Sequence, residues 1–169
     1  MSSGIPVNED CLKAFDAMKR LRLYKYVIFQ MNADFTDVVV GHRYRAKKVS
    51  GDSSEIASIT EGETAENTSN LEGASATEEE VFADFLKHLP ENECRYVIYD
   101  IEYTKKDVTS NKIVFVTWAP DTAKIKPKML YSSTKNNLSK RLEGVTTHIQ
   151  ANDLDEVTLD SFQEKLQRV

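Results

Sequence analysis

One stretch decides the fold: it reads Trp118-Ala-Pro-Asp121 and, after a short gap, Lys126-Pro-Lys-Met-Leu-Tyr-Ser-Ser-Thr-Lys135. The residues before Trp118 are β-branched or aromatic, which predicts a strand that ends there. Pro127 suits the first turn of a helix, where its missing N–H costs nothing. Inward-facing residues then recur at three- and four-residue spacing: Tyr131, Thr134, Leu138 and Leu142. The stretch therefore predicts a buried strand followed by a long amphipathic helix.

Another face of the expected helix combines lysines with small hydroxyl side chains: Lys128, Ser132, Lys135 and Ser139. Met129, near the helix start, adds an adaptable apolar group. Such a face suits docking into an acidic groove of a partner protein. The alternative is an ordinary solvated surface, which is what a row of lysines most often indicates.

The rest of the chain alternates between helical and strand patterns. Helices are expected at about 8–21, 78–89 and 159–166, and strands at 24–31, 36–46, 95–103, 112–118 and 148–151. The near-continuous apolar character of 95–103 and 112–118 indicates central strands covered on both faces. The polar connection 104–111 should project from one end of the sheet. We therefore expect an α/β fold of three layers, with a central mixed five-stranded sheet and helices on both faces.

Residues 50–77 differ in composition from everything around them. They are mostly Gly, Ser, Thr, Glu, Ala and Asn, which predicts a mobile loop. Every charged residue between Lys48 and Lys87 is acidic, whereas the whole chain of 169 residues has a net charge of only −5. The remainder is therefore mildly basic. We expect a single domain over 1–169 that carries an acidic, flexible insertion at about 50–77.

Several classes of protein are excluded. No apolar run approaches the roughly 18 residues that span a bilayer, and the N-terminus lacks the pattern of a secretory signal. Cys11 and Cys94 form neither a disulfide framework nor a metal spacing, which indicates reduced thiols in the cytoplasm. His42, His88 and His148 show no metal or catalytic-triad spacing. We expect no enzyme activity, catalytic residue, metal or cofactor, and no nucleic-acid partner, since basic residues do not alternate with exposed aromatics.

These features resemble the actin-depolymerising factor/cofilin family. The resemblance runs from about Ser2 to the end of the chain, with 50–77 as an extra insertion, and five stretches carry it: Ser3-Gly4, Leu89 to Tyr96, Tyr99-Asp100, Trp118 to Asp121 and Lys126 to Lys135. It implies the cofilin-like fold and a monomeric, cytoplasmic protein of the actin cytoskeleton. The basic cluster at 43–48 also fits nuclear import.

By motif position, the resemblance implies that an actin monomer contacts the long helix and the N-terminal segment. The residues concerned are Ser3, Gly4, Ile5, Lys126, Lys128, Met129, Ser132 and Lys135. Lysines at such a surface would form charge-assisted hydrogen bonds with acidic actin. Asn136 and Ser139 depart from the family pattern. Ser3 matches the family's regulatory phosphoserine, where a phosphate dianion would repel an acidic partner.

A second surface for filaments is implied at the polar connection and the last helix. Its residues are Lys105, Lys106, Lys112, Glu164, Lys165 and Arg168. Thr109, Ser110 and Asn111 stand where many family members carry a basic pair. Phosphoinositide headgroups are a further expected partner, with Lys140 and Arg141 as the main candidates, joined by Arg43, Arg45, Lys47 and Lys48.

The resemblance thus implies a protein that binds actin monomers and filaments and promotes filament disassembly by depolymerisation and severing. Phosphorylation at Ser3 and phosphoinositides would regulate it. One alternative is a member of the superfamily that sequesters monomers or binds filament sides without severing. Another is a scaffold whose acidic insertion recruits other proteins.

Overall fold

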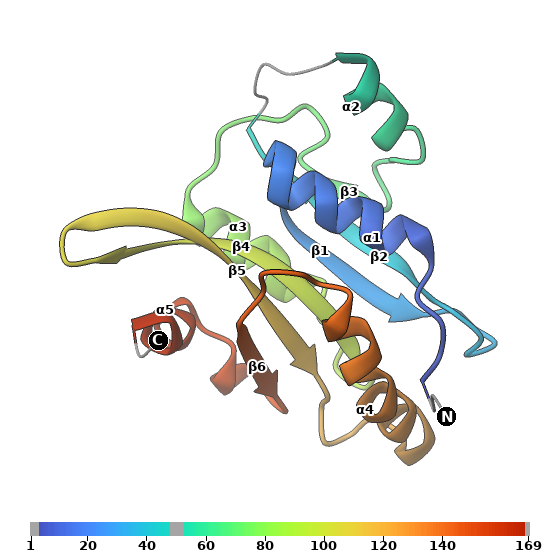
Figure 1. Cartoon of the computed structure of the whole chain (residues 1–169). Coiled ribbons are helices and arrows are strands. Elements are labelled where there is room, and N and C mark those ends of the chain that lie inside the picture. Colours follow the sequence, from blue (N-terminus) through green and yellow to red (C-terminus); the bar gives the residue numbers. More distant parts are fainter. Residues whose placement is uncertain (1–3, 48–52, 168–169) are drawn as a thin grey trace.

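The computed structural model describes residues 4–47 and 53–167 and contains one mixed sheet (Figure 1). Its strand order is β3-β2-β1-β4-β5-β6, in which β3 and β6 pair in parallel with their neighbours and the other pairs are antiparallel. The strands are β1 (Tyr24–Met31), β2 (Val38–Arg45), β3 (Thr68–Ser69), β4 (Arg95–Lys105), β5 (Val108–Trp118) and β6 (Thr147–Ala151).

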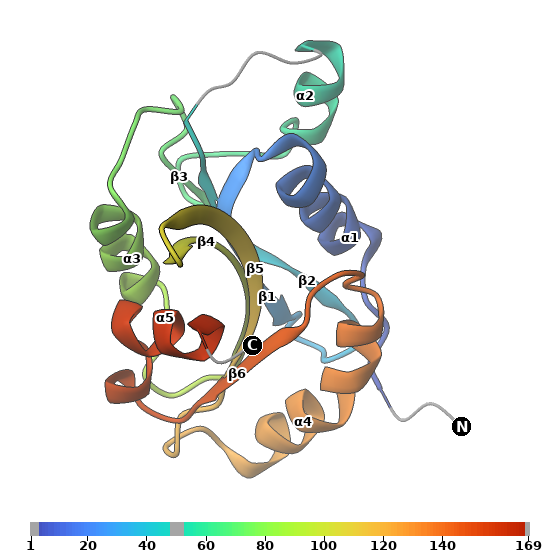
Figure 2. The same cartoon turned by 60° about the vertical axis from the view of Figure 1, so that its left-hand side comes forward.

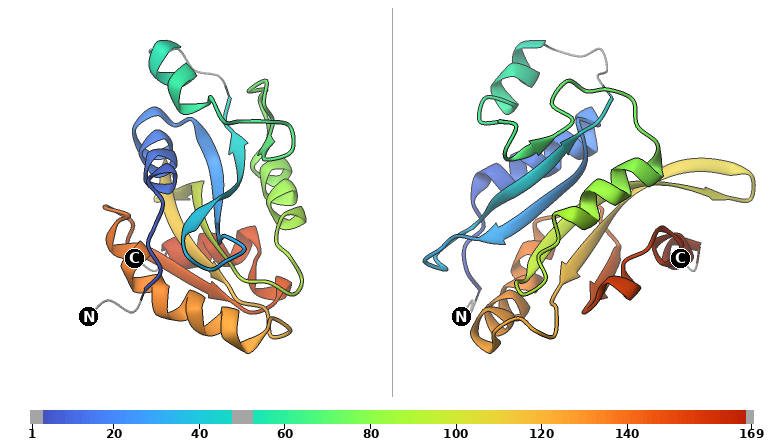
Figure 3. Two further views of the ribbon diagram at one scale, coloured as in Figure 1. Left: turned by 90° about the vertical axis from the view of Figure 1, so that its right-hand side faces the viewer. Right: turned by 180° about the vertical axis from the view of Figure 1, so that it is seen from behind.

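Helices cover both faces of this sheet, which confirms the predicted α/β architecture of three layers. Figures 2 and 3 show α1 (Glu9–Asp16) and α4 (Ile125–Lys140) on one face, and α3 (Glu78–Lys87) and α5 (Leu159–Gln167) on the other. A short π-helix, η1 (Ala17–Leu21), extends α1, and a 3-10 turn, η2 (Leu154–Glu156), precedes α5. No helix within the described ranges is long and apolar enough to cross a membrane.

The two faces bury separate cores because side chains alternate along each strand. In β1, Val27 and Phe29 belong to the core beneath α1 and α4, whereas Tyr26 and Ile28 belong to the core beneath α3 and α5. The central strands therefore read as almost continuously apolar, as the sequence predicted. The α4 core is the cluster that includes Phe15, Tyr96, Phe115, Tyr131 and Leu138, and the α5 core is the cluster that includes Phe82, Phe85, Tyr99, Val116 and Phe162.

The hairpin of β4 and β5 is longer than predicted. The two strands stay paired as far as Lys105 and Val108, and Lys106 and Asp107 form a tight turn with φ of 51° and 65°. The polar segment 104–111 is therefore mostly strand rather than a connection. Beyond the core, water solvates both faces of a strand, so apolar and polar residues need not alternate there. The apolar pattern in the sequence therefore ends before the backbone pairing of β4 with β5 ends.

The acidic segment contains regular structure that the sequence did not predict. Residues 53–77 include a helix, α2 (Ser53–Ile59), and the two-residue strand β3, which makes six strands instead of the expected five. Ion pairs attach the segment to the domain: Arg45 with Glu63 at 3.0 Å, and Arg20 with Glu55. Ile56 and Ile59 of α2 also pack against the α4 core. Two isoleucines and a few ion pairs leave no clear hydrophobic period in the sequence. The predicted flexibility of the segment stays a prediction.

Candidate functional site

Helix α4 is fixed to the sheet by its buried side. Tyr131, Thr134 and Leu138 are buried as their spacing predicted, and Leu142 is buried just beyond the helix. The Tyr131 hydroxyl accepts a hydrogen bond from the Met31 backbone N–H at 2.8 Å. In turn the Tyr96 hydroxyl donates to the Tyr131 carbonyl. These buried bonds position the helix axis on the sheet, and therefore also its outward face.

The outward face of α4 combines exposed apolar groups with lysines. Met129 is 66% exposed and Ile125 is 76% exposed, the two highest values among the large apolar side chains that the structure describes. Lys126 and Ser132 are also exposed. Ile125 was not singled out from the sequence. Ile125 directly precedes the lysine motif and lies outside the inward stripe, and this position could have indicated its exposure.

Two further lysines lie at the edges of this face. The Lys128 ammonium donates to the Asp121 carbonyl at 3.2 Å, and the Lys135 ammonium donates to Gln150 Oε1 at 3.4 Å. A hollow of about 280 Å³ lies between them, bordered by Tyr131, Ser132 and residues of β6. Both ammonium groups are thus held near the helix rather than extended into solvent.

The N-terminal segment lies against the same helix. The Ile5 backbone N–H donates to Thr134 Oγ1 at 3.1 Å, and Ile5 itself is buried. Gly4 packs so closely that a Cβ there would lie 3.3 Å from Asn137 Cβ and 3.5 Å from Thr134 Cα. Any larger residue at position 4 would crowd α4. Ser3 lies outside the described residues.

The structure thus brings Gly4, Ile5 and the predicted residues of α4 into one continuous surface. We call this the α4 surface: Gly4, Ile5, Ile125, Lys126, Lys128, Met129, Ser132 and Lys135. It has cationic groups, small hydroxyls and two exposed apolar side chains, which suits the docking of an acidic protein with an apolar patch.

Comparisons with known proteins show the family to which the chain belongs. The family described as "Cofilin/tropomyosin-type actin-binding protein" matches residues 47–167. The cofilin of Mycosarcoma maydis is 38% identical over 169 residues, which cover 99% of this chain and 98% of that protein. The chain belongs to the cofilin/actin-depolymerising factor family.

Two other relatives place the whole chain within this cofilin family. Actophorin of Acanthamoeba castellanii is 36% identical over 166 residues, covering 98% of this chain and 97% of actophorin. The crystal structure of Streptomyces griseoflavus cofilin superposes with a TM-score of 0.71 at 29% identity, covering 98% of both chains. The acidic segment is therefore part of a chain that otherwise matches cofilins from end to end.

The residues expected to contact filaments gather at the tip of the β4–β5 hairpin and on α5. Lys105 and Lys106 lie at the tip, and Lys112 pairs with Ile101 on the strand face that α5 covers. Two side-chain amides hold α5 against the hairpin: Gln163 Nε2 donates to the Glu102 carbonyl at 2.7 Å, and Gln167 Nε2 donates to the Thr104 carbonyl at 2.6 Å. The helix also carries Glu164 and Lys165, whereas Arg168 lies outside the described residues.

The residues expected to bind phosphoinositides lie on two elements. Lys140 and Arg141 are exposed at the C-terminal end of α4. Arg45 of β2 is only 14% exposed at its side chain and is ion-paired with the nearly buried carboxylate of Glu63. Arg45 is therefore occupied within the domain. Lys47 is exposed beyond the end of β2, and Lys48 lies outside the described residues.

Neither cysteine is placed for reactivity. Cys11 and Cys94 are buried free thiols, and the Cys11 thiol contacts the Val38 carbonyl at 3.4 Å. Burial raises the pKa of Cys11 to about 12 and also raises the pKa of Cys94. Because the thiolate is the reactive form, both groups act as small buried side chains.

Proposed function

We propose that this chain binds actin through the α4 surface and promotes the disassembly of actin filaments. Family membership gives the partner, since the matching family is one of actin-binding proteins. The observation that carries the proposal is the exposure of Ile125 and Met129 beside lysines, on a helix whose other side is buried and hydrogen-bonded to the sheet.

The contact works through complementary charge and shape. The lysines favour an acidic partner and accelerate its encounter. Met129 and Ile125 supply the apolar anchor, since binding energy concentrates in a few well-buried side chains. Gly4 and Ile5 add a second segment, and the bond from Ile5 to Thr134 places that segment on the helix before any partner arrives.

Disassembly requires that the protein prefer one state of the filament. A protein with equal affinity for two states shifts nothing, whereas one that prefers the ADP-bound, more twisted filament favours fragmentation and loss of subunits. We propose this preference for the chain because the chain resembles cofilins. We propose that the chain acts in the cytoplasm, as a monomer, on the actin cytoskeleton.

Co-sedimentation with filamentous actin tests the proposal. The parent should pellet with filaments and also raise the amount of actin in the supernatant. Lys126→Ala/Lys128→Ala should do neither. A matched control, Lys13→Ala/Lys87→Ala, removes the same charge from α1 and α3 and should behave like the parent. Equal loss in both double variants would mean that net charge, not the α4 surface, drives binding.

Filament binding is proposed to use a second surface formed by the hairpin tip and α5. Its residues are Lys105, Lys106, Lys112, Glu164, Lys165 and Arg168. One observation favours the alternative of monomer sequestration or filament-side binding without severing: Thr109, Ser110 and Asn111 of β5 carry no charge. If the parent raises soluble actin without pelleting, the sequestering alternative holds.

Regulation is proposed at two places. A phosphate on Ser3 would add negative charge next to Gly4, which packs on α4, and so would repel an acidic partner. Ser3→Asp should weaken actin binding while Ser3→Ala does not, and equal binding by both would refute this. Phosphoinositides would bind Lys140 and Arg141, so Lys140→Ala/Arg141→Ala should lose binding to vesicles that contain them.

A further inference from the structure

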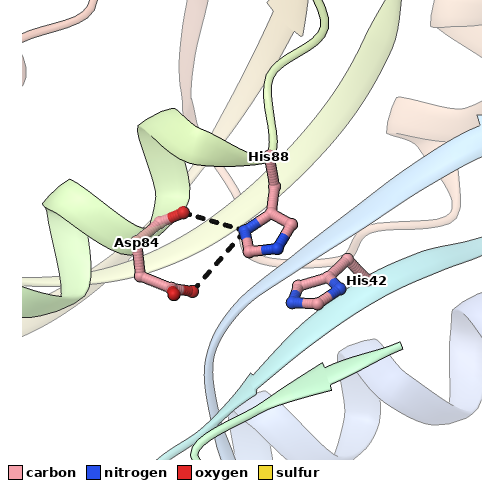
Figure 4. Close-up of side chains that lie close together, drawn as sticks. All are labelled: His42, Asp84 and His88. Carbon is pink, nitrogen blue, oxygen red and sulfur yellow. Dashed lines mark hydrogen bonds and ion pairs between the residues drawn. The ribbon is translucent and has the colours of Figure 1, made fainter. Parts of the chain in front are cut away.

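Two histidines and an aspartate converge on the face of the sheet opposite α4. His42 comes from β2, Asp84 comes from α3, and His88 is the residue that caps the C-terminal end of α3 (Figure 4). Each residue offers one metal-ligand atom, and these atoms all lie within 4.8 Å of one another. The sequence shows no metal spacing among the histidines, because a strand and a helix far apart in the chain supply the two rings.

Helical geometry brings Asp84 and His88 together. Asp84 lies in the last turn of α3 and His88 caps that turn four residues later, so that His88 Nδ1 is 3.6 Å from Asp84 Oδ2. Packing of α3 on the sheet then adds His42, whose ring stacks on that of His88 with centroids 3.7 Å apart. The three groups are therefore positioned by the fold and not by a flexible loop.

Neighbouring polar groups orient all three side chains. The Tyr26 hydroxyl donates to Asp84 Oδ2 at 2.5 Å. His88 Nδ1 is 2.8 Å from the Asp84 carbonyl, which can only accept, so Nδ1 carries the hydrogen and Nε2 keeps its lone pair. His42 Nε2 is 2.8 Å from Ser69 Oγ of β3. Hydrogen bonds from ligand rings to neighbouring polar groups are typical of metal sites, and the ring that turns to bind the ion exchanges its present partner.

The cluster is accessible from the surface. A surface hollow of about 320 Å³ opens next to His42 and His88 and provides an entry path. Lys87 and Arg95 also line the hollow and oppose a cation, whereas the Asp84 carboxylate favours it.

We propose that His42, Asp84 and His88 form a binding site for one Zn²⁺ ion. Two imidazoles and one carboxylate are a donor set that Zn²⁺ accepts, with water in the fourth position. Ca²⁺ and Mg²⁺ prefer oxygen ligands alone. The planes of the two rings differ by only 18°, so at least one ring must rotate about its Cβ–Cγ bond for both to share an ion. The bound ion would tie β2 to α3.

Titration of the full chain with Co²⁺, which replaces Zn²⁺ and absorbs visible light, tests the site. The parent should bind one Co²⁺ with the spectrum of nitrogen and oxygen ligands, and Zn²⁺ should displace it. His42→Gln and His88→Gln should each weaken binding by at least about tenfold, since loss of even an outer partner costs about 10–100-fold. The control His148→Gln removes the exposed histidine of β6 and should bind like the parent.

Thermal unfolding gives a second, independent reading. Zn²⁺ should raise the unfolding midpoint of the parent and of His148→Gln, and not that of His42→Gln or His88→Gln. Should His42→Gln fail to fold, His88→Gln and Asp84→Asn carry the test, because both positions are partly exposed. Equal binding by all variants, no binding by the parent, or a thiolate-to-cobalt band from Cys11 or Cys94 would each overturn the proposal.

Discussion

The two faces of the sheet are stabilised by different chemistry. The α4 core contains tyrosine and threonine hydroxyls that bond to backbone groups, as Tyr131 does to Met31 and Thr134 to Ile5. The α5 core has fewer bonds of this kind, such as Trp118 Nε1 to the Pro90 carbonyl, and holds a larger cluster of aromatic rings, several in edge-to-face contact, such as Phe82 with Phe162 at 5.4 Å between centroids. Hydrogen bonds have fixed directions, whereas ring packing tolerates small shifts. The first face is therefore suited to holding a surface in position, and the second to supplying stability.

The largest expected effect comes from deleting one ring on each face. Tyr131→Ala and Phe162→Ala should each lower the free energy of unfolding by about 3–5 kcal/mol, because both side chains are buried. Only Tyr131→Ala should also weaken binding to actin monomers at temperatures where the variant is folded, since it removes the bond that positions α4. Denaturant unfolding and a binding assay with monomeric actin measure the two quantities. An equal loss of binding in both variants would break the comparison.

Acid should destabilise the protein partly through the α5 face, where His42 is buried. Its pKa is about 4 in the folded state against 6.5 for a free side chain, so the unfolded state binds more protons between these values. The free energy of unfolding should therefore fall as the pH falls from about 6.5 to about 4, by up to about 1.4 kcal/mol per pH unit.

Denaturant unfolding across this pH range, with a chelator present, checks the effect. His42→Gln should have a shallower dependence on pH than the parent, whereas His148→Gln should keep the parent's dependence. The expected slope includes the effects of two neighbouring groups. Asp84 raises the pKa of His42, whereas His88 lowers it. Parallel curves for the parent and His42→Gln would contradict the prediction.

A smaller effect is expected from the single hydroxyl that ties the N-terminal segment to α4. Thr134→Val keeps the shape of the side chain but removes the acceptor for the buried Ile5 N–H, which should cost about 1–3 kcal/mol. Hydrogen exchange at the Ile5 amide should become faster. Thr134→Ser keeps the hydroxyl and serves as the control, so faster exchange in both variants would mean that packing, not the bond, holds the segment.

The smallest effect is expected where α5 holds the hairpin. Gln163→Ala/Gln167→Ala removes two exposed hydrogen bonds to carbonyl groups of β4, each with a net contribution of about 0.5–1.5 kcal/mol at most. Global stability should change little, but backbone amides at the hairpin tip should exchange faster and filament binding should weaken. Asp160→Ala, on the same helix, is the control. Unchanged exchange would show that the hairpin is rigid without α5.

The elements that bury side chains were predictable from the sequence. The stripe of α4, the apolar strands β1, β4 and β5, and the capping box of Thr77 and Glu80 follow local rules of spacing and hydrogen bonding. The proximity of Gly4 and Ile5 to α4 was expected only through the resemblance to cofilins. It depends on one bond between residues far apart in the chain.

Other features depend on partners that no local pattern records. The strands beyond Tyr103 continue through backbone pairing with polar residues on both sides. Helix α2 and the loop after it form ion pairs with Arg20 and Arg45, and β3 pairs with the backbone of β2. The cluster of His42, Asp84 and His88 forms only when α3 packs on β2. In each case the deciding contact is polar and long-range, so hydrophobic periodicity could not reveal it.

The two-residue strand β3 also affects how copies of the protein behave toward one another. It pairs with Arg43 and Tyr44, and so covers part of the outer edge of β2. An uncovered strand offers unpaired N–H and C=O groups to any other extended chain and invites aggregation. A variant of this protein without residues 53–77 would expose a longer stretch of unpaired backbone along β2. The acidic segment would then matter for solubility at high concentration, as a barrier against edge-to-edge assembly.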